Sequence, residues 1–205
     1  MPKYSIIIPA YNAEDRIRKV LDSVRCQEYK DYELIVICDS CTDNTESIAK
    51  KEYKAITRKV NFHNDGLSRS KGLDIAKGDW ILFLDDDDWW LHEYVLSMID
   101  EAICQLENGN TNVLQFGFIW KGKGYCPSRK NPNSKEQPMY ANVWTKCIRR
   151  SFIGDTRFPE VHSTSDYEFM KLLNAKGINL AYLDQAIYYY NWLREGSISE
   201  IDSRK

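Results

Sequence analysis

The sequence has no apolar run that approaches the length of a membrane-spanning helix, which takes about 20 consecutive apolar residues. It also has no excess of basic residues, because 28 lysines and arginines are offset by 30 aspartates and glutamates, for a net charge of −2. A surface that attracts nucleic acid or anionic lipid is therefore not predicted. The chain opens with Met1-Pro2-Lys3 and enters an apolar segment at once, without a signal-peptide pattern, so we expect a cytoplasmic protein.

The common glycine-rich phosphate loops are missing as well. The segment after the first apolar run reads Pro9-Ala10-Tyr11, and neither G-x-G-x-x-G nor G-x-x-x-x-G-K occurs in the chain. This absence argues against a Rossmann dinucleotide fingerprint and a P-loop. It also disfavours a nucleotidyltransferase, which would place a glycine-rich phosphate loop where Pro9-Ala10-Tyr11 stands.

Cysteines and histidines show no spacing typical of a metal site. Of the six cysteines, only Cys38 and Cys41 form a C-x-x-C pair. Without a second pair or neighbouring histidines, this pair is weak evidence for zinc or redox chemistry. The three histidines are equally scattered. We expect free thiols, as in a reducing compartment, and histidines that are structural or exposed.

The composition is that of an ordinary globular domain with a regular alternation of elements. A chain of 205 residues, 43% hydrophobic and 28% charged, is long enough to bury a real core. The first 90 residues read β-α-β-α-β-α-β, which is typical of a parallel sheet with right-handed crossovers. The predicted strands are Tyr4–Ile8, Tyr32–Cys38, Val60–His63 and Gly78–Leu84, and the helices between them cover about 13–27, Thr45–Tyr53 and 67–78.

The second half has fewer clear signals. A polar segment over Lys121–Pro138 has little apolar content, so we expect a mobile loop there. No internal repeat or linker is evident, and we predict one domain over residues 1–205. Its predicted elements are a helix over His92–Glu107, a strand over Val113–Trp120, a helix opened by Asp166, and strands over Leu180–Leu183 and Ile187–Trp192.

The stretch from Gly78 to Trp90 points most directly to chemistry. An uninterrupted apolar run over Ile81–Leu84 fits a strand buried on both faces, and four aspartates, Asp85–Asp88, follow it directly. Adjacent carboxylates repel one another unless a cation lies among them. A hard divalent ion such as Mg²⁺ or Mn²⁺ accepts oxygen ligands of this kind. The alternative is a solvated acidic loop, which the preceding strand and the following tryptophan pair disfavour.

Taken together, the motifs of this chain resemble the family 2 glycosyltransferases of the GT-A fold. The resemblance runs in order along nearly the whole chain, and it is the ordered set that is specific. The resemblance implies an α/β fold with a Rossmann-like, mostly parallel central sheet flanked by helices and a smaller C-terminal region. It divides the domain into a nucleotide-sugar-binding half, 1–90, and an acceptor-side half, 91–205. The motifs are Ser5–Asn12, Asp39 with Thr42–Thr45, Gly66–Leu73, Ala76–Asp79, Asp85–Asp88, Trp144–Lys146, Phe158–Glu160, Asp166-Tyr167 and Ser197–Ser199.

The resemblance implies a donor site at the ends of the early strands. Tyr11, with Pro9 and Ala10 before it, matches the positions that hold the nucleotide, where an aromatic face can stack on a base. Asp39 matches the carboxylate that accepts a ring N–H of the base, and Arg69 an arginine suited to phosphate. Each also has an ordinary structural explanation: a core tyrosine, a helix N-cap and a solvated helix arginine.

The acidic run matches the D-x-D motif of the family. The resemblance implies that Asp85 or Asp86 meets the ribose hydroxyls and that Asp87 reaches a Mn²⁺ or Mg²⁺ ion on the donor diphosphate. Asp88 is expected behind them as a supporting group. The two tryptophans that follow, Trp89 and Trp90, could stack on a sugar ring or pack against the next helix.

Asp166 matches the catalytic base of inverting members of the family. It would take the proton from an acceptor hydroxyl as that oxygen attacks the anomeric carbon. Glu168 is a competing base, and a helix N-terminal carboxylate is the structural alternative. Two departures from the pattern are Ser70, where asparagine is common, and Ser165, where a second acidic residue is common.

The function implied is transfer of a sugar from a nucleotide diphosphate sugar, with UDP the favoured nucleotide, to a hydroxyl acceptor with inversion. The acceptor could be a glycan, a lipid-linked sugar, a protein or a modified nucleic acid, and the oligomeric state is open. Two alternatives are carried forward. One is a nucleotide-sugar-binding protein without turnover, and the other is a nucleotidyltransferase.

Overall fold

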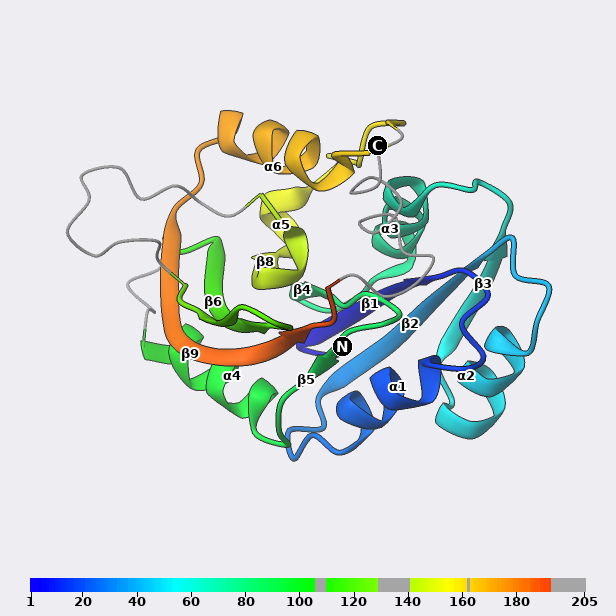
Figure 1. Ribbon diagram of the computed structural model, residues 1–205. Helices are drawn as coiled ribbons and strands as arrows, with labels where there is room; N and C mark the ends of the chain where they lie inside the picture. The colour runs from blue at the N-terminus through cyan, green and yellow to red at the C-terminus, as the bar shows by residue number, and fades with distance from the viewer. Residues whose placement is uncertain (106–109, 129–140, 162, 193–205) are drawn as a thin grey trace.

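The computed structural model describes residues 1–105, 110–128, 141–161 and 163–192. Helices and strands alternate over the first half, and strands dominate the second (Figure 1). The elements are β1 (Tyr4–Ala10), α1 (Ile17–Arg25), β2 (Tyr32–Asp39), α2 (Thr45–Tyr53), β3 (Ile56–Val60), α3 (Asp65–Ile75), β4 (Trp80–Phe83), β5 (Trp89–Trp90), α4 (Val95–Gln105), β6 (Val113–Trp120), β7 (Gly124–Cys126), the short 3-10 helix η1 (Val143–Thr145), β8 (Lys146–Arg149), α5 (Arg150–Ile153), α6 (Ser165–Ala175) and β9 (Leu180–Tyr190).

In the described part of the chain, the strands form one nine-stranded sheet. Its order is β3-β2-β1-β4-β8-β6-β9-β5, with β7 paired to β6 beside this path. The first four strands of that order are mutually parallel, as the alternation of elements predicts. Strand β8 is antiparallel to both β4 and β6, and β9 returns parallel to β6. The predicted α/β architecture is confirmed, with its parallel pairs concentrated in the first half.

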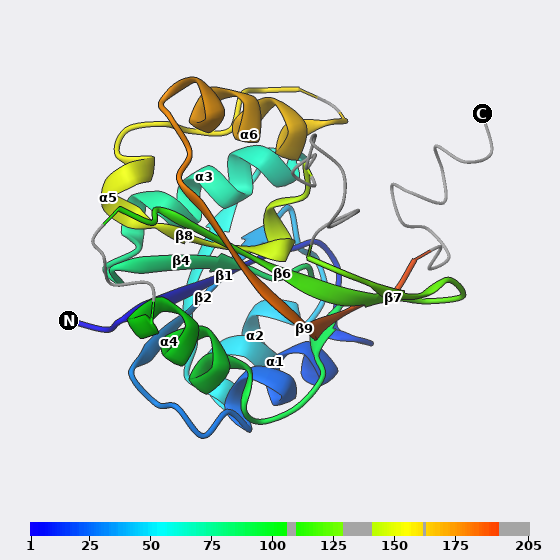
Figure 2. The same cartoon turned by 90° about the vertical axis from the view of Figure 1, so that its left-hand side faces the viewer.

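Helices cover both faces of the sheet. Helices α1, α2 and α4 lie on one face, and α3, α5 and α6 lie on the other (Figures 1 and 2). Helix α1 shows why: its buried residues recur every three or four positions and form a single apolar stripe. Each such buried side chain contributes about 1.5–3 kcal/mol to folding. The residues of the stripe are Ile17, Val20, Leu21 and Val24.

The third strand lies earlier than its prediction over Val60–His63. It covers Ile56–Val60, because the backbone N–H groups of residues 62–64 donate to the carboxylate of Asp39 instead of to a neighbouring strand. A strand cannot continue through residues whose donors are used in this way. The prediction followed apolar content and could not detect this long-range acceptor.

The C-terminal strand is continuous where two strands were predicted. Strand β9 runs unbroken over Leu180–Tyr190, although the polar pair Asp184-Gln185 interrupts its apolar pattern. The register against β6 shifts on both sides of Gly117, so that Phe116 pairs with Leu183 and Gly117 with Ala186. This bulge leaves the polar pair exposed without ending the strand.

Two further predictions are tested only in part. Within the predicted loop Lys121–Pro138, Gly124–Cys126 forms β7 against β6, and residues 129–138 lie outside the described residues, so the expected mobility stays a prediction. The helix predicted over His92–Glu107 is observed as α4, Val95–Gln105, and Glu107 also lies outside the description. No helix in the described ranges is long and apolar enough to cross a bilayer.

Asp88 ties the last strand to the acidic loop. Its side chain is fully buried, and it accepts hydrogen bonds from the Tyr188 hydroxyl at 2.6 Å and from the Asn191 backbone N–H at 2.8 Å. The backbone N–H of Asp85 donates to the same tyrosine hydroxyl at 3.4 Å. Burial, with repulsion from Asp85 and Asp87, raises the pKa of Asp88 well above its ordinary value. The second half of the chain therefore holds the acidic loop in place.

This contact predicts the effect of removing one hydroxyl. Tyr188→Phe leaves the buried carboxylate with one donor fewer, so the free energy of unfolding should fall by about 1–3 kcal/mol. Urea denaturation measures this loss. Tyr189→Phe is the matched control, because Tyr189 contributes to the fold through its ring, which stacks on Trp89 at 4.2 Å. Equal stability losses in the two variants would contradict a specific role for the Tyr188 hydroxyl.

Candidate active site

The predicted site residues of the first half gather at one edge of the sheet. Strands β1, β2 and β4 are parallel, so their carboxyl ends meet, and open α/β sheets bind ligands at such an edge. Tyr11 follows β1, Asp39 ends β2, and Asp85 follows β4 shortly after Phe83. Tyr11 is 56% exposed, which leaves its ring accessible for stacking and argues against a core role.

Asp39 is engaged in the fold itself. Its carboxylate accepts backbone N–H groups from Phe62, His63 and Asn64 at 2.7–3.0 Å. The hydroxyls of Ser40 and Ser68 donate to it as well, each at 2.9 Å. Burial alone would raise the pKa of this carboxyl, but the hydrogen bonds outweigh burial and lower it. Asp39 is therefore anionic and shapes the loop after β3, a role that the sequence did not predict.

Asp86 is paired with an arginine that sequence reasoning missed. The guanidinium of Arg16 donates to Asp86 Oδ2 at 2.8 Å and to the carbonyls of Tyr11 and Asn12. The backbone N–H of Tyr11 donates to the same carboxylate oxygen at 3.1 Å. The loop after β1 and the acidic loop after β4 are joined by this arrangement. Arg16 belongs to no recognisable motif and lies 70 residues from its partner, so no local pattern predicts the pair.

A second arginine, Arg69 of α3, connects three carboxylates. Its side chain is only 4% exposed, and it hydrogen-bonds Asp65, on the preceding turn of α3, and Asp85 Oδ1, the latter at 2.6 Å. Its Nη1 lies 3.5 Å from Asp166 Oδ1. We call Arg69, Asp65, Asp85 and Asp166 the Arg69 cluster. The structure places Arg69 among these acidic residues, and its contact with a donor phosphate stays a prediction.

The Arg69 cluster brings the predicted base, Asp166, next to the D-x-D motif. Asp166 Oδ2 accepts the backbone N–H of Val143 at 3.0 Å, and Oδ1 is buried without a hydrogen-bond partner among the described residues. Burial raises the pKa of Asp166, although Arg69 and the Val143 N–H act in the opposite direction. A buried acceptor left open in this way is suited to a donor group on a ligand.

Crowded carboxylates also perturb Asp85. Burial raises its pKa to about 7; Arg69 opposes this shift, and repulsion from Asp166 and Asp87 adds to it. A cation beside these carboxylates would relieve their repulsion, so the charge of the site is compatible with a bound metal ion. In the described ranges, no group of three or more His, Cys, Asp or Glu side chains could hold an ion by itself. An ion placed here would need further ligands from outside the protein, such as a bound diphosphate and water.

The remaining predicted features have mixed outcomes. Trp89 stacks on Tyr189 and carries the Lys19 ammonium over its ring at 3.0 Å, so it packs within the protein. Glu168, also on α6, pairs with Lys171 at 3.1 Å. Ser165 lies where a helper carboxylate was expected, and its hydroxyl contacts Asp65 at 3.3 Å. Asp65 of α3 thus places a carboxylate next to position 165, where the family pattern would have an acidic residue.

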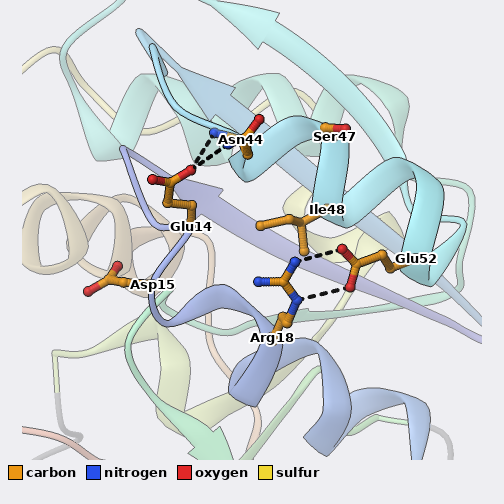
Figure 3. Close-up of a pocket in the computed structure, with 7 residues that line it drawn as sticks. All are labelled: Glu14, Asp15, Arg18, Asn44, Ser47, Ile48 and Glu52. Atoms are coloured by element: carbon orange, nitrogen blue, oxygen red, sulfur yellow. Dashed lines mark hydrogen bonds and ion pairs between the residues drawn. The ribbon is translucent and has the colours of Figure 1, made fainter.

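A hollow between α1 and α2 lies apart from these residues (Figure 3). Its charged groups are largely paired: Arg18 meets Glu52 through two hydrogen bonds at 2.7 and 2.9 Å, and Glu14 accepts the backbone and side-chain N–H groups of Asn44. Helices α1 and α2 cover the face opposite α3 and α6, which carry Arg69, Asp65 and Asp166 of the Arg69 cluster (Figure 1). None of the predicted site residues lines this hollow.

Comparison with known proteins identifies the class. The sequence profile described as "Glycosyl transferase family 2" matches residues 5–153, which is most of the chain. The chain belongs to this family. The GT-A fold implied by the resemblance is confirmed by solved structures: Staphylococcus aureus TarS 1-349 in complex with UDP-GlcNAc superposes with a TM-score of 0.78 at 25% identity, over 97% of this chain and 60% of that one.

Two further relatives define how far the similarity reaches. A GalNAc(5)-diNAcBac-PP-undecaprenol beta-1,3-glucosyltransferase of Campylobacter jejuni is 33% identical over 97% of this chain and 68% of its own length. A mannosyltransferase of Pyrobaculum calidifontis, solved with GDP-Man and Mn²⁺, has a TM-score of 0.71 at 14% identity, covering 95% of this chain and 58% of that one, and shares the fold. The chain spans between 32% and 68% of the length of three curated relatives that it matches.

The crowding around Asp85 predicts a pH dependence of stability. The folded pKa of about 7 exceeds the ordinary value of 3.8, so the folded state keeps a proton that the unfolded state loses as pH rises between these values. The contribution of Asp85 to the free energy of unfolding should therefore decline from about pH 4 to 7 in the presence of a chelator. Asp85→Asn should reduce this decline by up to about 1.4 kcal/mol per pH unit, the most that one proton contributes. Urea denaturation across this range tests it; a variant slope equal to wild type would contradict the shift.

Proposed function

We propose that the protein is an inverting, metal-assisted glycosyltransferase that moves a sugar from a UDP-sugar to a hydroxyl acceptor. The observation that carries the proposal is Asp166: a partly buried carboxylate in the Arg69 cluster, held at Oδ2 by the Val143 N–H, whose Oδ1 has no hydrogen-bond partner among the described residues. Membership of the family supports the reaction class. The UDP-GlcNAc in the TarS structure supports a uridine donor.

The proposed donor site follows the edge of the sheet. The base would stack on the exposed ring of Tyr11, at the end of the segment Pro9-Ala10-Tyr11. Asp39 would act on the base mainly through the loop that it holds, since its carboxylate already accepts five donors. Asp86, oriented by Arg16, is the proposed acceptor for ribose hydroxyls. Residues 1–90 would thus form the donor half.

The chemistry of transfer needs a base, a positioned acceptor and a stabilised leaving group. Asp166 would accept the proton of the acceptor hydroxyl through its open Oδ1 as the oxygen attacks the anomeric carbon. Arg69 would hold Asp85 and Asp166 at fixed separation. Asp87 would hold Mn²⁺ or Mg²⁺, which neutralises charge on the departing diphosphate.

The acceptor half would be residues 91–205. The Campylobacter relative carries an undecaprenol-linked glycan in its name, and TarS is named as a transferase to poly(ribitol-phosphate). The first name contains a lipid-linked glycan and the second a polymer of ribitol phosphate. We propose an acceptor of this broad class, a carbohydrate or polyol hydroxyl on a larger carrier.

The metal role predicts cation-dependent donor binding. Asp87→Asn should weaken binding of a UDP-sugar in the presence of Mn²⁺ and leave the fold intact, because losing one charge relieves repulsion in the empty site. Calorimetric titration of UDP-GlcNAc, with Mn²⁺ and with chelator, measures this. Wild-type protein with equal affinity under both conditions would contradict the metal role.

The base role predicts an effect confined to the chemical step. Asp166→Asn keeps the size of the side chain but removes its ability to take a proton, so transfer should fall by roughly 10²–10⁴-fold while UDP-sugar affinity stays near wild type. The measurement is UDP release across a panel of UDP-sugars and carbohydrate acceptors, with the anomeric configuration of the product determined by NMR.

Glu168→Gln is the matched control, since Glu168 pairs with Lys171 and should be dispensable. A product that retains the donor's anomeric configuration would rule out direct displacement assisted by Asp166. Wild-type protein that binds UDP-sugars but releases no UDP with any acceptor would favour a binding protein over an enzyme. Incorporation of a nucleoside monophosphate with release of pyrophosphate would instead favour nucleotidyl transfer.

A further inference from the structure

Lys146 is a fully buried lysine that the proposed mechanism does not use. It opens β8, directly after η1, and its side chain is 0% exposed. A buried ammonium is costly unless its donors are satisfied. The Nζ group donates to the backbone carbonyl of Asn142 at 2.7 Å and to the Thr145 hydroxyl at 2.9 Å. Both acceptors lie within the turn that precedes β8.

The carbonyl that accepts from Lys146 belongs to the same peptide group that contacts Asp166. The Asn142 C=O and the Val143 N–H are the two ends of one planar amide. Lys146 donates to its oxygen, and its N–H donates to Asp166 Oδ2 at 3.0 Å. A cation on the oxygen of an amide polarises the group and strengthens its N–H as a donor. The contacts therefore form a chain from ammonium to peptide to carboxylate.

We propose that Lys146 is a positioning residue for the catalytic carboxylate, which acts on Asp166 through the Asn142–Val143 peptide. The proposal rests on the assignment of Asp166 as the base. Lys146 fixes the orientation of the peptide and strengthens its N–H, so that Oδ2 is held and Oδ1 faces the acceptor hydroxyl. Lys146 does not touch a substrate in this role.

The charges around Asp166 agree with this arrangement. Arg69 and Lys146 favour the anionic carboxylate, whereas Asp65 and burial oppose it, and Asp85 repels it from the acidic loop. Burial lowers the pKa of Lys146 to about 7, and attraction to Asp166 acts in the opposite direction. Removal of the lysine should therefore make Asp166 easier to protonate.

The test is Lys146→Met, which keeps most of the side-chain volume and removes the charge. The fold should tolerate the change, because the Thr145 hydroxyl also donates to the Asn142 carbonyl, at 2.9 Å. Two readouts follow. A ¹³C-carboxyl NMR titration should show the pKa of Asp166 raised by about one unit. The turnover number should fall roughly 10–100-fold with unchanged affinity for UDP-GlcNAc and Mn²⁺.

Lys176→Met is the matched control. Lys176 donates to the backbone carbonyls of Phe152 and Ile153 at 2.6 and 2.8 Å. Its replacement therefore also removes an ammonium from backbone carbonyls, but these carbonyls are not linked to Asp166. It should leave the Asp166 titration and turnover unchanged. Combined with Asp166→Asn, Lys146→Met should cause no additional loss of turnover, since its effect passes through the carboxylate.

An Asp166 titration that is the same in wild type and Lys146→Met would overturn the proposal. So would a turnover loss that adds to that of Asp166→Asn. The NMR measurement needs no turnover, so it decides the role of Lys146 even if no UDP-sugar is a substrate. Absence of transfer in the wild type would count against the proposed function alone. A Lys146→Met chain that fails to fold is replaced by Lys146→Gln, for which the same two outcomes apply.

Discussion

The buried guanidinium of Arg69 is the interaction on which the site depends. Three carboxylates from two helices and the acidic loop converge on it, and without a central cation they could not share a largely buried space. Removing one partner from such a cluster leaves an uncompensated charge and costs more than the pair contributes. The cluster therefore fixes where α3 and α6 sit relative to the end of β4, and with them the distance between the D-x-D motif and the proposed base.

The repulsion among these carboxylates also explains why the acidic loop of the first half needs contacts from the second half of the fold. A parallel four-strand unit places Asp85–Asp88 at its edge, but nothing within that unit neutralises or orients them all. Arg16 pairs with Asp86 and Arg69 pairs with Asp85. Asp88 is buried against β9, where it accepts a hydrogen bond from Tyr188. The antiparallel return of β8 then carries η1 and Lys146 to the far side of Asp166.

Much of this was predictable from the sequence, and the limits have a physical pattern. Apolar periodicity located β1, β2, α2 and β6, since burial along a strand or helix is a local signal. The acidic run was identified because four adjacent aspartates directly after a buried strand are unusual, whereas Asp166 was identified only through the family resemblance. The partners could not be identified: Arg16 lies 70 residues from Asp86, and Asp39 shapes a loop 23 to 25 residues away. Such contacts depend on the topology of the fold. The contacts of Asp39 are also the reason why the third strand ends earlier than predicted.

The protein-only contacts leave the site prepared for a ligand. Asp86 accepts hydrogen bonds on Oδ2 from Arg16 and the Tyr11 N–H, whereas the contact of its Oδ1 among the described residues is a longer one of 3.4 Å to Arg16. Asp166 is likewise held at Oδ2, and its Oδ1, 3.5 Å from Arg69 Nη1, has no hydrogen-bond partner in the part of the chain that the structure describes. Each carboxylate is thus fixed through one oxygen and keeps acceptor capacity on the other. Groups oriented before binding lose little conformational freedom when a ligand arrives, so the hydrogen bonds that hold these carboxylates would also favour binding of donor and acceptor.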